Sequence, residues 1–175
     1  MSELHDYLSA LNASIEHRQT GAEYFHNHPE NVPKLFDWAT APNAKRVNKT
    51  SAWILEVYVL KDISVFHTYW PLLLERLPHI KNESMRRPLS KITHIYLEEF
   101  FDRISAEQKS AVLGICFDWL LEPAAVATLN FALRCLYLLK DHEAWVWEQL
   151  QAIVQEQYPL ASPGYKVAAR QIMNH

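Results

Sequence analysis

Apolar residues recur at helical spacing along most of the chain. The clearest stretch is 105–121, where one face carries Val112, Ile115, Cys116, Trp119 and Leu120 at positions i, i+3, i+4, i+7 and i+8. Ser105 and Gln108 can open this helix as a capping box, because each side chain can bond the backbone N–H of the other residue. No stretch alternates convincingly with period two, so the pattern predicts an all-α protein.

Prolines and capping residues divide the chain into its predicted helices. Ser162 followed by Pro163, for example, is a typical helix start. We predict helices near 3–18, 21–28, 31–40, 44–61, 64–77, 83–101, 105–121, 123–140, 142–157 and 162–174.

The predicted helices recur in pairs, a shorter first helix followed by a longer second one. Aligning the second helices brings Lys49, Arg87, Leu129 and Lys166 into register, at spacings of 38, 42 and 37 residues. A period near 40 is typical of helical-repeat arrays, whose units bury their apolar faces by stacking. We therefore predict a right-handed α-α superhelix of about four HEAT-like two-helix repeats, forming a single domain over residues 1–175.

Four short motifs carry a resemblance to known proteins. The stretches SAWILEVY (51–58), RPLSKI (87–92), CFDWL (116–120) and GYKVAAR (164–170) are similar to a family of small HEAT-like, armadillo-type proteins of unknown function. Some members of that family are labelled adenylosuccinate lyase. The S-S-x-M-P-x-K-x-N loop of such lyases has no counterpart in this sequence, and the chain is too short for their long-helix core.

Composition excludes several classes of function. Three glycines leave no Gly-rich phosphate loop, and a formal net charge of -3 gives no strong field for nucleic acid or anionic lipid. The N-terminus lacks the apolar core of a signal peptide, and no run approaches the roughly 20 apolar residues of a membrane span. We therefore expect a cytoplasmic protein without a cofactor or metal, in which Cys116 and Cys135 are buried reduced thiols.

Basic residues stand at equivalent positions of the second helices. In HEAT-like arrays these helices line the concave side, so a binding ridge could comprise Lys49, Arg87, Lys166, Arg86 and Arg46. The acidic residues Asp37, Glu75 and Asp118 are also in register, at the ends of the first helices. The same charges could therefore form a structural ladder between repeats, and Leu129 interrupts either arrangement in the third unit.

A second set of polar residues lies one turn further along the second helices. Glu56 and His94 hold equivalent positions in neighbouring repeats, and Glu98 follows His94 by four residues. Because Glu56 is flanked by apolar residues, its burial would require a partner. Together the three could form a metal or acid–base site, or simply a satisfied polar contact.

The six tryptophans divide by position. We predict a core position for Trp38, Trp53, Trp119 and Trp147, which lie on apolar stripes, and partial exposure for Trp70 and Trp145, near helix starts.

These patterns favour a non-enzymatic module that presents the concave face of a short array to a protein or peptide partner. The first alternative is a small enzyme or metal site around Glu56, His94 and Glu98, which would include the lyase label. The second is binding of a nucleic-acid backbone through the basic starts of the second helices, which the net charge disfavours.

Overall fold

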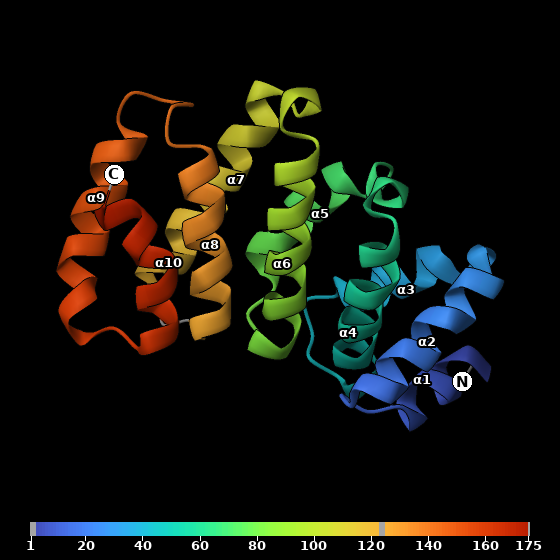
Figure 1. The fold of residues 1–175 in the computed structure, drawn as a ribbon. Coiled ribbons are helices and arrows are strands. Elements are labelled where there is room, and N and C mark those ends of the chain that lie inside the picture. The colour runs from blue at the N-terminus through green and yellow to red at the C-terminus, as the bar shows by residue number, and fades with distance from the viewer. Residues whose placement is uncertain (1–2, 123–124, 175) are drawn as a thin grey trace. The chain divides into compact units, whose positions relative to one another are not determined.

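The computed structural model describes residues 3–122 and 125–174 and is built of helices throughout (Figure 1). The described residues contain no strand, as the sequence predicts, and none of their helices has the length and apolarity needed to span a membrane. They form ten α-helices, two more than four two-helix units would contain. The estimate of about four units is therefore too low.

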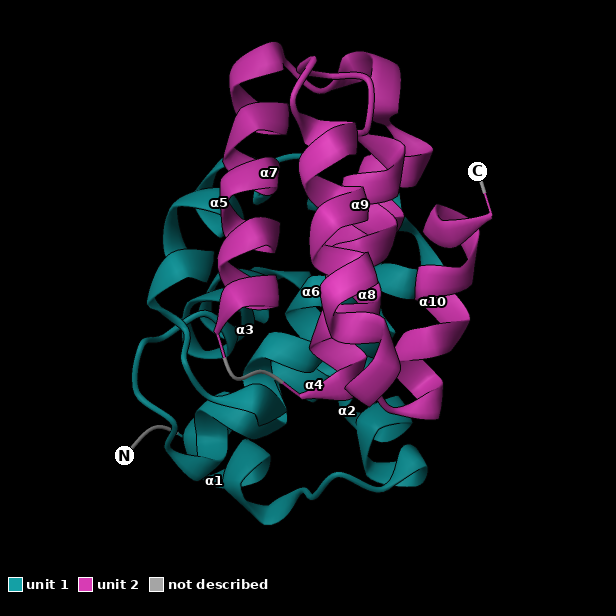
Figure 2. Ribbon diagram, turned by 90° about the vertical axis from the view of Figure 1, so that its left-hand side faces the viewer, with its two compact units in different colours: residues 1–92 teal, residues 93–175 magenta. Residues whose placement is uncertain are grey.

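The chain divides into two compact units, residues 1–92 and 93–175, which Figure 2 colours separately. The first unit contains α1 (Glu3–Ala10), α2 (Ile15–Asn27), α3 (Val32–Ala39), α4 (Arg46–Lys61), α5 (Trp70–Arg76) and the beginning of α6 (Glu83–Glu99). The second contains the rest of α6, then α7 (Ala106–Leu121), α8 (Val126–Leu138), α9 (Val146–Gln157) and α10 (Pro163–Met173). Short 3₁₀ turns follow several helices, at Pro29–Asn31, Ile63–Phe66, Leu77–His79, Phe101–Arg103 and Tyr158–Leu160.

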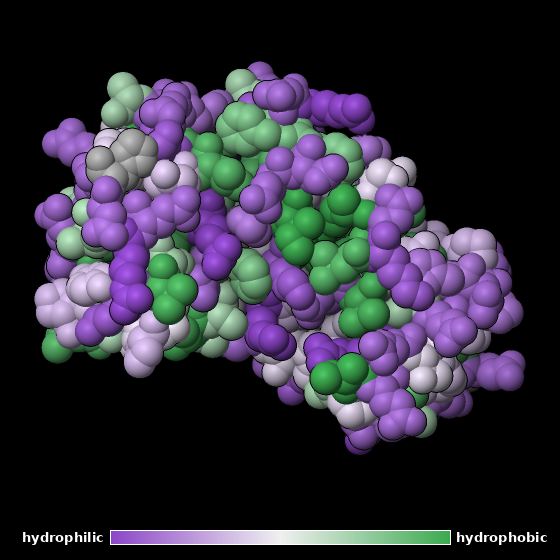
Figure 3. All heavy atoms as spheres, viewed as in Figure 1, coloured by the Kyte–Doolittle hydropathy of each residue, from purple (hydrophilic) through white to green (hydrophobic). Residues whose placement is uncertain are grey.

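In each unit one helix packs against several others. In the first unit α4 packs against α1, α2 and α3, and in the second unit α8 packs against α7 and α10. Most residues of α4 are buried, as expected of a helix with neighbours on more than one side, whereas α8 is buried at fewer positions, namely Thr128, Ala132, Leu133, Cys135 and Leu136. On the face drawn in Figure 3, hydrophilic side chains predominate over the outer helices α1 and α2.

Gly21 lets α2 approach α4 closely. A Cβ atom at Gly21 would lie 2.5 Å from Cδ1 of Ile54 on α4, well inside van der Waals contact. Gly114 on α7 is the opposite case, because a Cβ atom there would meet nothing within 4 Å.

Helix starts predicted from capping residues are confirmed. Ser105 and Gln108 form both hydrogen bonds of a capping box at the start of α7. Ser162 accepts from the backbone N–H of Tyr165, and Pro163 is the first residue of α10.

The predicted single helix over 3–18 is wrong, because α1 ends at Ala10 and α2 begins at Ile15. Asn12 Oδ1 accepts from the backbone N–H of Ser14, and Ser14 Oγ accepts from that of His17. These local bonds compete with a continuous helix and then cap the next one. The helix predicted over 64–77 is also shorter, since α5 begins only at Trp70, after the 3₁₀ turn Ile63–Phe66.

Burial agrees only in part with the predictions for the tryptophans. Trp119 is 2% exposed and Trp145 is 52% exposed, as predicted, whereas Trp38, Trp53 and Trp147 are half-buried rather than core residues. Trp70 is also 2% exposed, so its predicted partial exposure is wrong; the first turn of α5 faces the core of the first unit.

Candidate functional site

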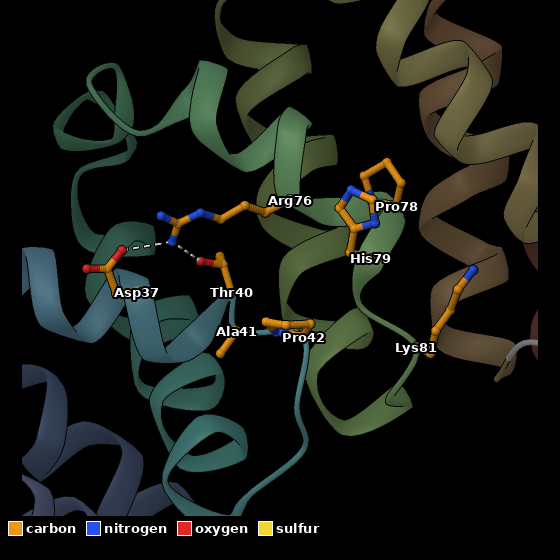
Figure 4. A pocket seen from close by; sticks show the side chains of 8 residues that line it. All are labelled: Asp37, Thr40, Ala41, Pro42, Arg76, Pro78, His79 and Lys81. Carbon is orange, nitrogen blue, oxygen red and sulfur yellow. Dashed lines mark hydrogen bonds and ion pairs between the residues drawn. The ribbon is translucent and has the colours of Figure 1, made fainter.

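The first candidate site is a groove lined by side chains from segments 37–42 and 76–81, which we call the α3–α5 groove (Figure 4). Arg76, in the last turn of α5, reaches toward the end of α3. Its Nη1 donates to Asp37 Oδ1 and to Thr40 Oγ1, each at 2.8 Å. The guanidinium also lies over the ring of Phe36, with Cζ 5.3 Å from the ring centroid. Arg76 is therefore held in one orientation by three neighbours on α3 and its C-terminal cap.

Thr40 connects this arrangement to the helix end. As the C-cap of α3, Thr40 donates both its backbone N–H and its hydroxyl to the carbonyl oxygen of Phe36. Its hydroxyl oxygen then accepts from Arg76. The groove wall is thus built from a helix terminus whose free carbonyl is satisfied locally.

The groove is large and open. Its volume is about 860 Å³, and Pro42, Pro78, His79 and Lys81 along it are exposed. Two prolines supply rigid apolar contact surface. Among the described residues that line the groove, Arg76, His79 and Lys81 are basic and Asp37 is the one carboxylate. This arrangement suits an extended ligand with acceptor groups.

The second candidate site surrounds Glu56 on α4, and we call it the Glu56 hollow. Glu56 is 5% exposed, and its Oε1 accepts from Lys91 Nζ on α6 at 2.8 Å. Among the residues that the structure describes, its buried Oε2 has no hydrogen-bond partner, and neither has the buried Nε of Arg18 on α2. Both Arg18 and Lys91 line the hollow together with Lys61, the last residue of α4. Three cations from three helices therefore surround one carboxylate.

The remaining wall of the Glu56 hollow is largely apolar. Val57 and Leu60 contribute to it from α4, and Ile15, which is 66% exposed, lies at the start of α2. The volume is about 290 Å³, which is the scale of one amino-acid residue rather than of a long peptide.

The predicted polar site of Glu56, His94 and Glu98 is only partly assembled. Glu56 has Lys91 as its partner, as its apolar flanks required. His94 Nε2 lies 4.0 Å from Glu98 Oε2, and the His94 ring faces that of Phe131 with centroids 6.0 Å apart. A contact between Glu56 and His94 stays a prediction.

Burial is the main cause of the electrostatic change at His94. Its side chain is 10% exposed, and burial lowers the pKa of His94 below its ordinary value. Glu98 opposes this shift and Arg134 reinforces it. Glu98 is 61% exposed, so its opposing effect is screened by solvent.

The five basic residues of the predicted ridge have different surroundings. Arg86 is 3% exposed, and its Nε donates to the carbonyl of Ile80 at 2.6 Å. Arg46 Nη2 donates to the carbonyl of Leu11, and Lys166 Nζ lies over the Tyr158 ring. These three therefore have roles within their own units.

Lys49 and Arg87 differ from the other three. Within residues 3–122 and 125–174, neither side chain forms an ion pair; Arg87 is exposed and Lys49 is half-buried. The ladder expected between Asp37 and Lys49 is not formed, because Asp37 pairs with Arg76 instead. Arg76 lies 39 residues after Asp37, so the repeat spacing was the signal that could have identified it.

Metal and thiol chemistry have little support in the described part of the chain. It contains no group of three or more His, Cys, Asp or Glu side chains placed to hold a metal ion. Cys116 and Cys135 are buried free thiols, as predicted. Burial, followed by a hydrogen bond with Cys116, raises the pKa of the Cys135 thiol well above its ordinary value, which disfavours the reactive thiolate.

Comparison with known proteins gives no family: no protein-family model, no curated protein and no solved structure matches the chain. The resemblance to small HEAT-like proteins therefore stays a prediction from the four quoted motifs.

Proposed function

We propose that the protein is a non-enzymatic interaction module that binds a protein or peptide partner. Its helices would form HEAT-like, armadillo-type repeats in a right-handed superhelix. Within the units, consecutive helices pack against each other, α3 against α4, α7 against α8 and α9 against α10. Together with the period near 40, this supports the repeat architecture. Fold alone does not imply function, so the proposal depends on a site.

The α3–α5 groove is the observation that carries the proposal. Arg76 is oriented before any partner arrives, because Asp37 and Thr40 both bond its Nη1. Arg76 therefore loses less side-chain entropy on binding a partner's acceptor than a free arginine would. Both bonds use the same nitrogen, so neither Asp37 nor Thr40 occupies the other two guanidinium nitrogens.

The groove also indicates the partner's chemistry. Its exposed basic side chains favour a segment with acidic side chains, and the two prolines offer rigid apolar contacts to an extended backbone. Lys49 and Arg87, which lack ion pairs among the described residues, would extend this basic surface along the second helices of the first unit.

The experiment is a pull-down from the native cell with the purified protein and with variants that reverse or remove charges of the groove. We expect Lys81→Glu and Arg76→Gln to reduce partner recovery by about tenfold, since both remove charge from the groove. Lys34→Glu is the matched control, because Lys34 is an exposed lysine of α3 outside the groove. Circular dichroism checks that each variant is folded.

A further variant separates the groove from the second-helix ridge. If Lys49→Glu with Arg87→Glu abolishes recovery while Lys81→Glu and Arg76→Gln leave it unchanged, the partner binds the ridge and not the groove. Equal recovery with the wild type, Lys34→Glu and all groove and ridge variants would reject the proposal.

A further inference from the structure

The Glu56 hollow contains two buried polar atoms, one a hydrogen-bond donor and the other an acceptor. Arg18 Nε is a donor without an acceptor, and Glu56 Oε2 is an acceptor without a donor. Unsatisfied buried groups of this kind are rare in folded proteins, and each calls for a specific explanation. They do not satisfy one another, so a species that lies between them must offer both an acceptor and a donor.

The positive charges that line the hollow indicate which acceptor group the bound species carries. Arg18, Lys61 and Lys91 all line the hollow, whereas Glu56 is the one carboxylate among its described lining residues and already binds Lys91. A concave site with an excess of positive charge concentrates anions, and a guanidinium binds a carboxylate with strong, directional hydrogen bonds. The acceptor is therefore best supplied by a carboxylate.

The donor end has to be neutral. An ammonium group would be repelled by the three surrounding cations, whereas an amide N–H can donate to Glu56 Oε2 without adding charge. The wall of Ile15, Val57 and Leu60 then offers an apolar side chain a surface to cover, and Ile15 at the rim is 66% exposed.

We propose that the Glu56 hollow binds an N-acyl amino-acid carboxylate with an apolar side chain. The carboxylate lies at Arg18 with Lys61 and Lys91 nearby, and the adjacent amide N–H donates to Glu56 Oε2. This chemistry has two sources, the C-terminal residue of a peptide and a free N-acylated amino acid. The site uses none of the residues of the α3–α5 groove, so the proposal goes beyond the proposed function and can fail independently of it.

The test is a titration of the full chain with N-acetyl-leucine at low salt, followed by NMR amide shifts and calorimetry. We expect saturable binding with shifts on α2, α4 and α6. N-acetyl-leucinamide, which lacks the carboxylate, and 4-methylpentanoate, which lacks the N–H, should each bind about tenfold more weakly. No binding at millimolar probe, or equal binding of either analogue, would overturn the proposal, as would equal binding of inorganic phosphate.

Variants assign the binding to the named atoms. Arg18→Gln should weaken N-acetyl-leucine about tenfold, and Arg170→Gln, at an exposed arginine of α10 that does not line the hollow, should leave its binding unchanged. Glu56→Gln should remove the preference for N-acetyl-leucine over 4-methylpentanoate. Wild-type affinity of Arg18→Gln for N-acetyl-leucine would refute the assignment. The probe series uses the unaltered protein, so the proposal can be contradicted even if a variant misfolds.

Two further probes distinguish the sources. A pentapeptide ending in leucine that binds at least tenfold more tightly than N-acetyl-leucine, and loses this on C-terminal amidation, would assign the site to peptide C-termini. Similar affinities of peptide and N-acetyl-leucine would support a free N-acylated amino acid.

Discussion

The two compact units differ in the polar side chains that they bury and in the apolar side chains that they expose. Most of the buried polar side chains among the described residues belong to the first unit, namely Thr40, Asn48, Thr50, Ser51, Glu56, Arg86 and Ser90. The second unit buries Thr93, His94 and Thr128. It also contains most of the exposed large apolar side chains among the described residues, including Leu121, Val126, Trp145, Leu160 and Val167. Buried polar groups require fixed partners, so the first unit is where charges are held in defined positions. Both candidate sites lie there.

If apolar packing stabilises the second unit, truncating its core should have the largest effect. Trp119→Ala removes an indole that is 2% exposed on the most periodic stripe of the chain. We expect a loss of about 3–5 kcal/mol in the free energy of unfolding, measured by urea denaturation. Trp145→Ala, at a position 52% exposed on the same unit, is the control and should change little. A wild-type unfolding midpoint for Trp119→Ala would contradict this view of the second unit.

Removing one partner of the buried ion pair tests the first unit. Lys91→Met leaves the Glu56 carboxylate 5% exposed and without its cation, and should lower stability by about 2–3 kcal/mol. The double variant Glu56→Leu with Lys91→Met should recover most of the loss, because no charge is left buried. Additive losses in the double variant would show that the two side chains stabilise the unit through packing rather than through their charges.

Two alanine substitutions compare helix contacts in the units directly. Gly21→Ala should destabilise by about 1–3 kcal/mol, since its Cβ would overlap Ile54 at 2.5 Å. Gly114→Ala should stabilise by about 0.5–1 kcal/mol, because the position is helical and open. Thermal melts should therefore shift in opposite directions. An unchanged or raised melting temperature for Gly21→Ala would mean that the close approach of α2 to α4 is not maintained in solution.

The smallest expected effect concerns pH and the second unit. Burial lowers the pKa of His94 in the folded state, so as pH falls the unfolded chain binds more protons than the folded chain. The contribution of a neutral His94 to the free energy of unfolding is fully present above its ordinary pKa of 6.5. It declines as pH falls from there toward the lower pKa of the folded state. We expect urea unfolding at pH 7.5 and 5.5 to show this decline, and His94→Gln to reduce it. His26→Gln, at an exposed histidine of the first unit, should reduce it less.

Local chemistry explains which parts of the fold could be predicted from sequence. The starts of α7 and α10 follow from side chains that cap their own helix, so a few neighbouring residues suffice. The break at 11–14 was missed because the apolar stripe of Leu4, Leu8, Leu11 and Ile15 continues across it. Hydrogen bonds of Asn12 and Ser14 interrupt the helix there, and Ile15 is left exposed rather than buried.

The sites depend on contacts that spacing alone identifies poorly. The apolar flanks of Glu56 predict a buried acid that needs a partner, and Glu56 is 5% exposed. They do not identify which residue that partner is. Lys91, which comes three residues before His94, is the partner. Residues three apart lie on the same face of a helix, only about 60° apart around its axis, so equivalent repeat positions indicate the face but not which of its side chains makes the contact.

The two buried thiols can report on local unfolding of the second unit. Cys116 and Cys135 lie on α7 and α8, both are buried, and the first unit contains no cysteine. Their modification by a thiol reagent requires exposure of the second unit, whereas amide hydrogen exchange reports on both units. Labelling rates measured alongside exchange therefore separate the local opening of α7 and α8 from that of the charged seams around α4, without introducing any label or mutation.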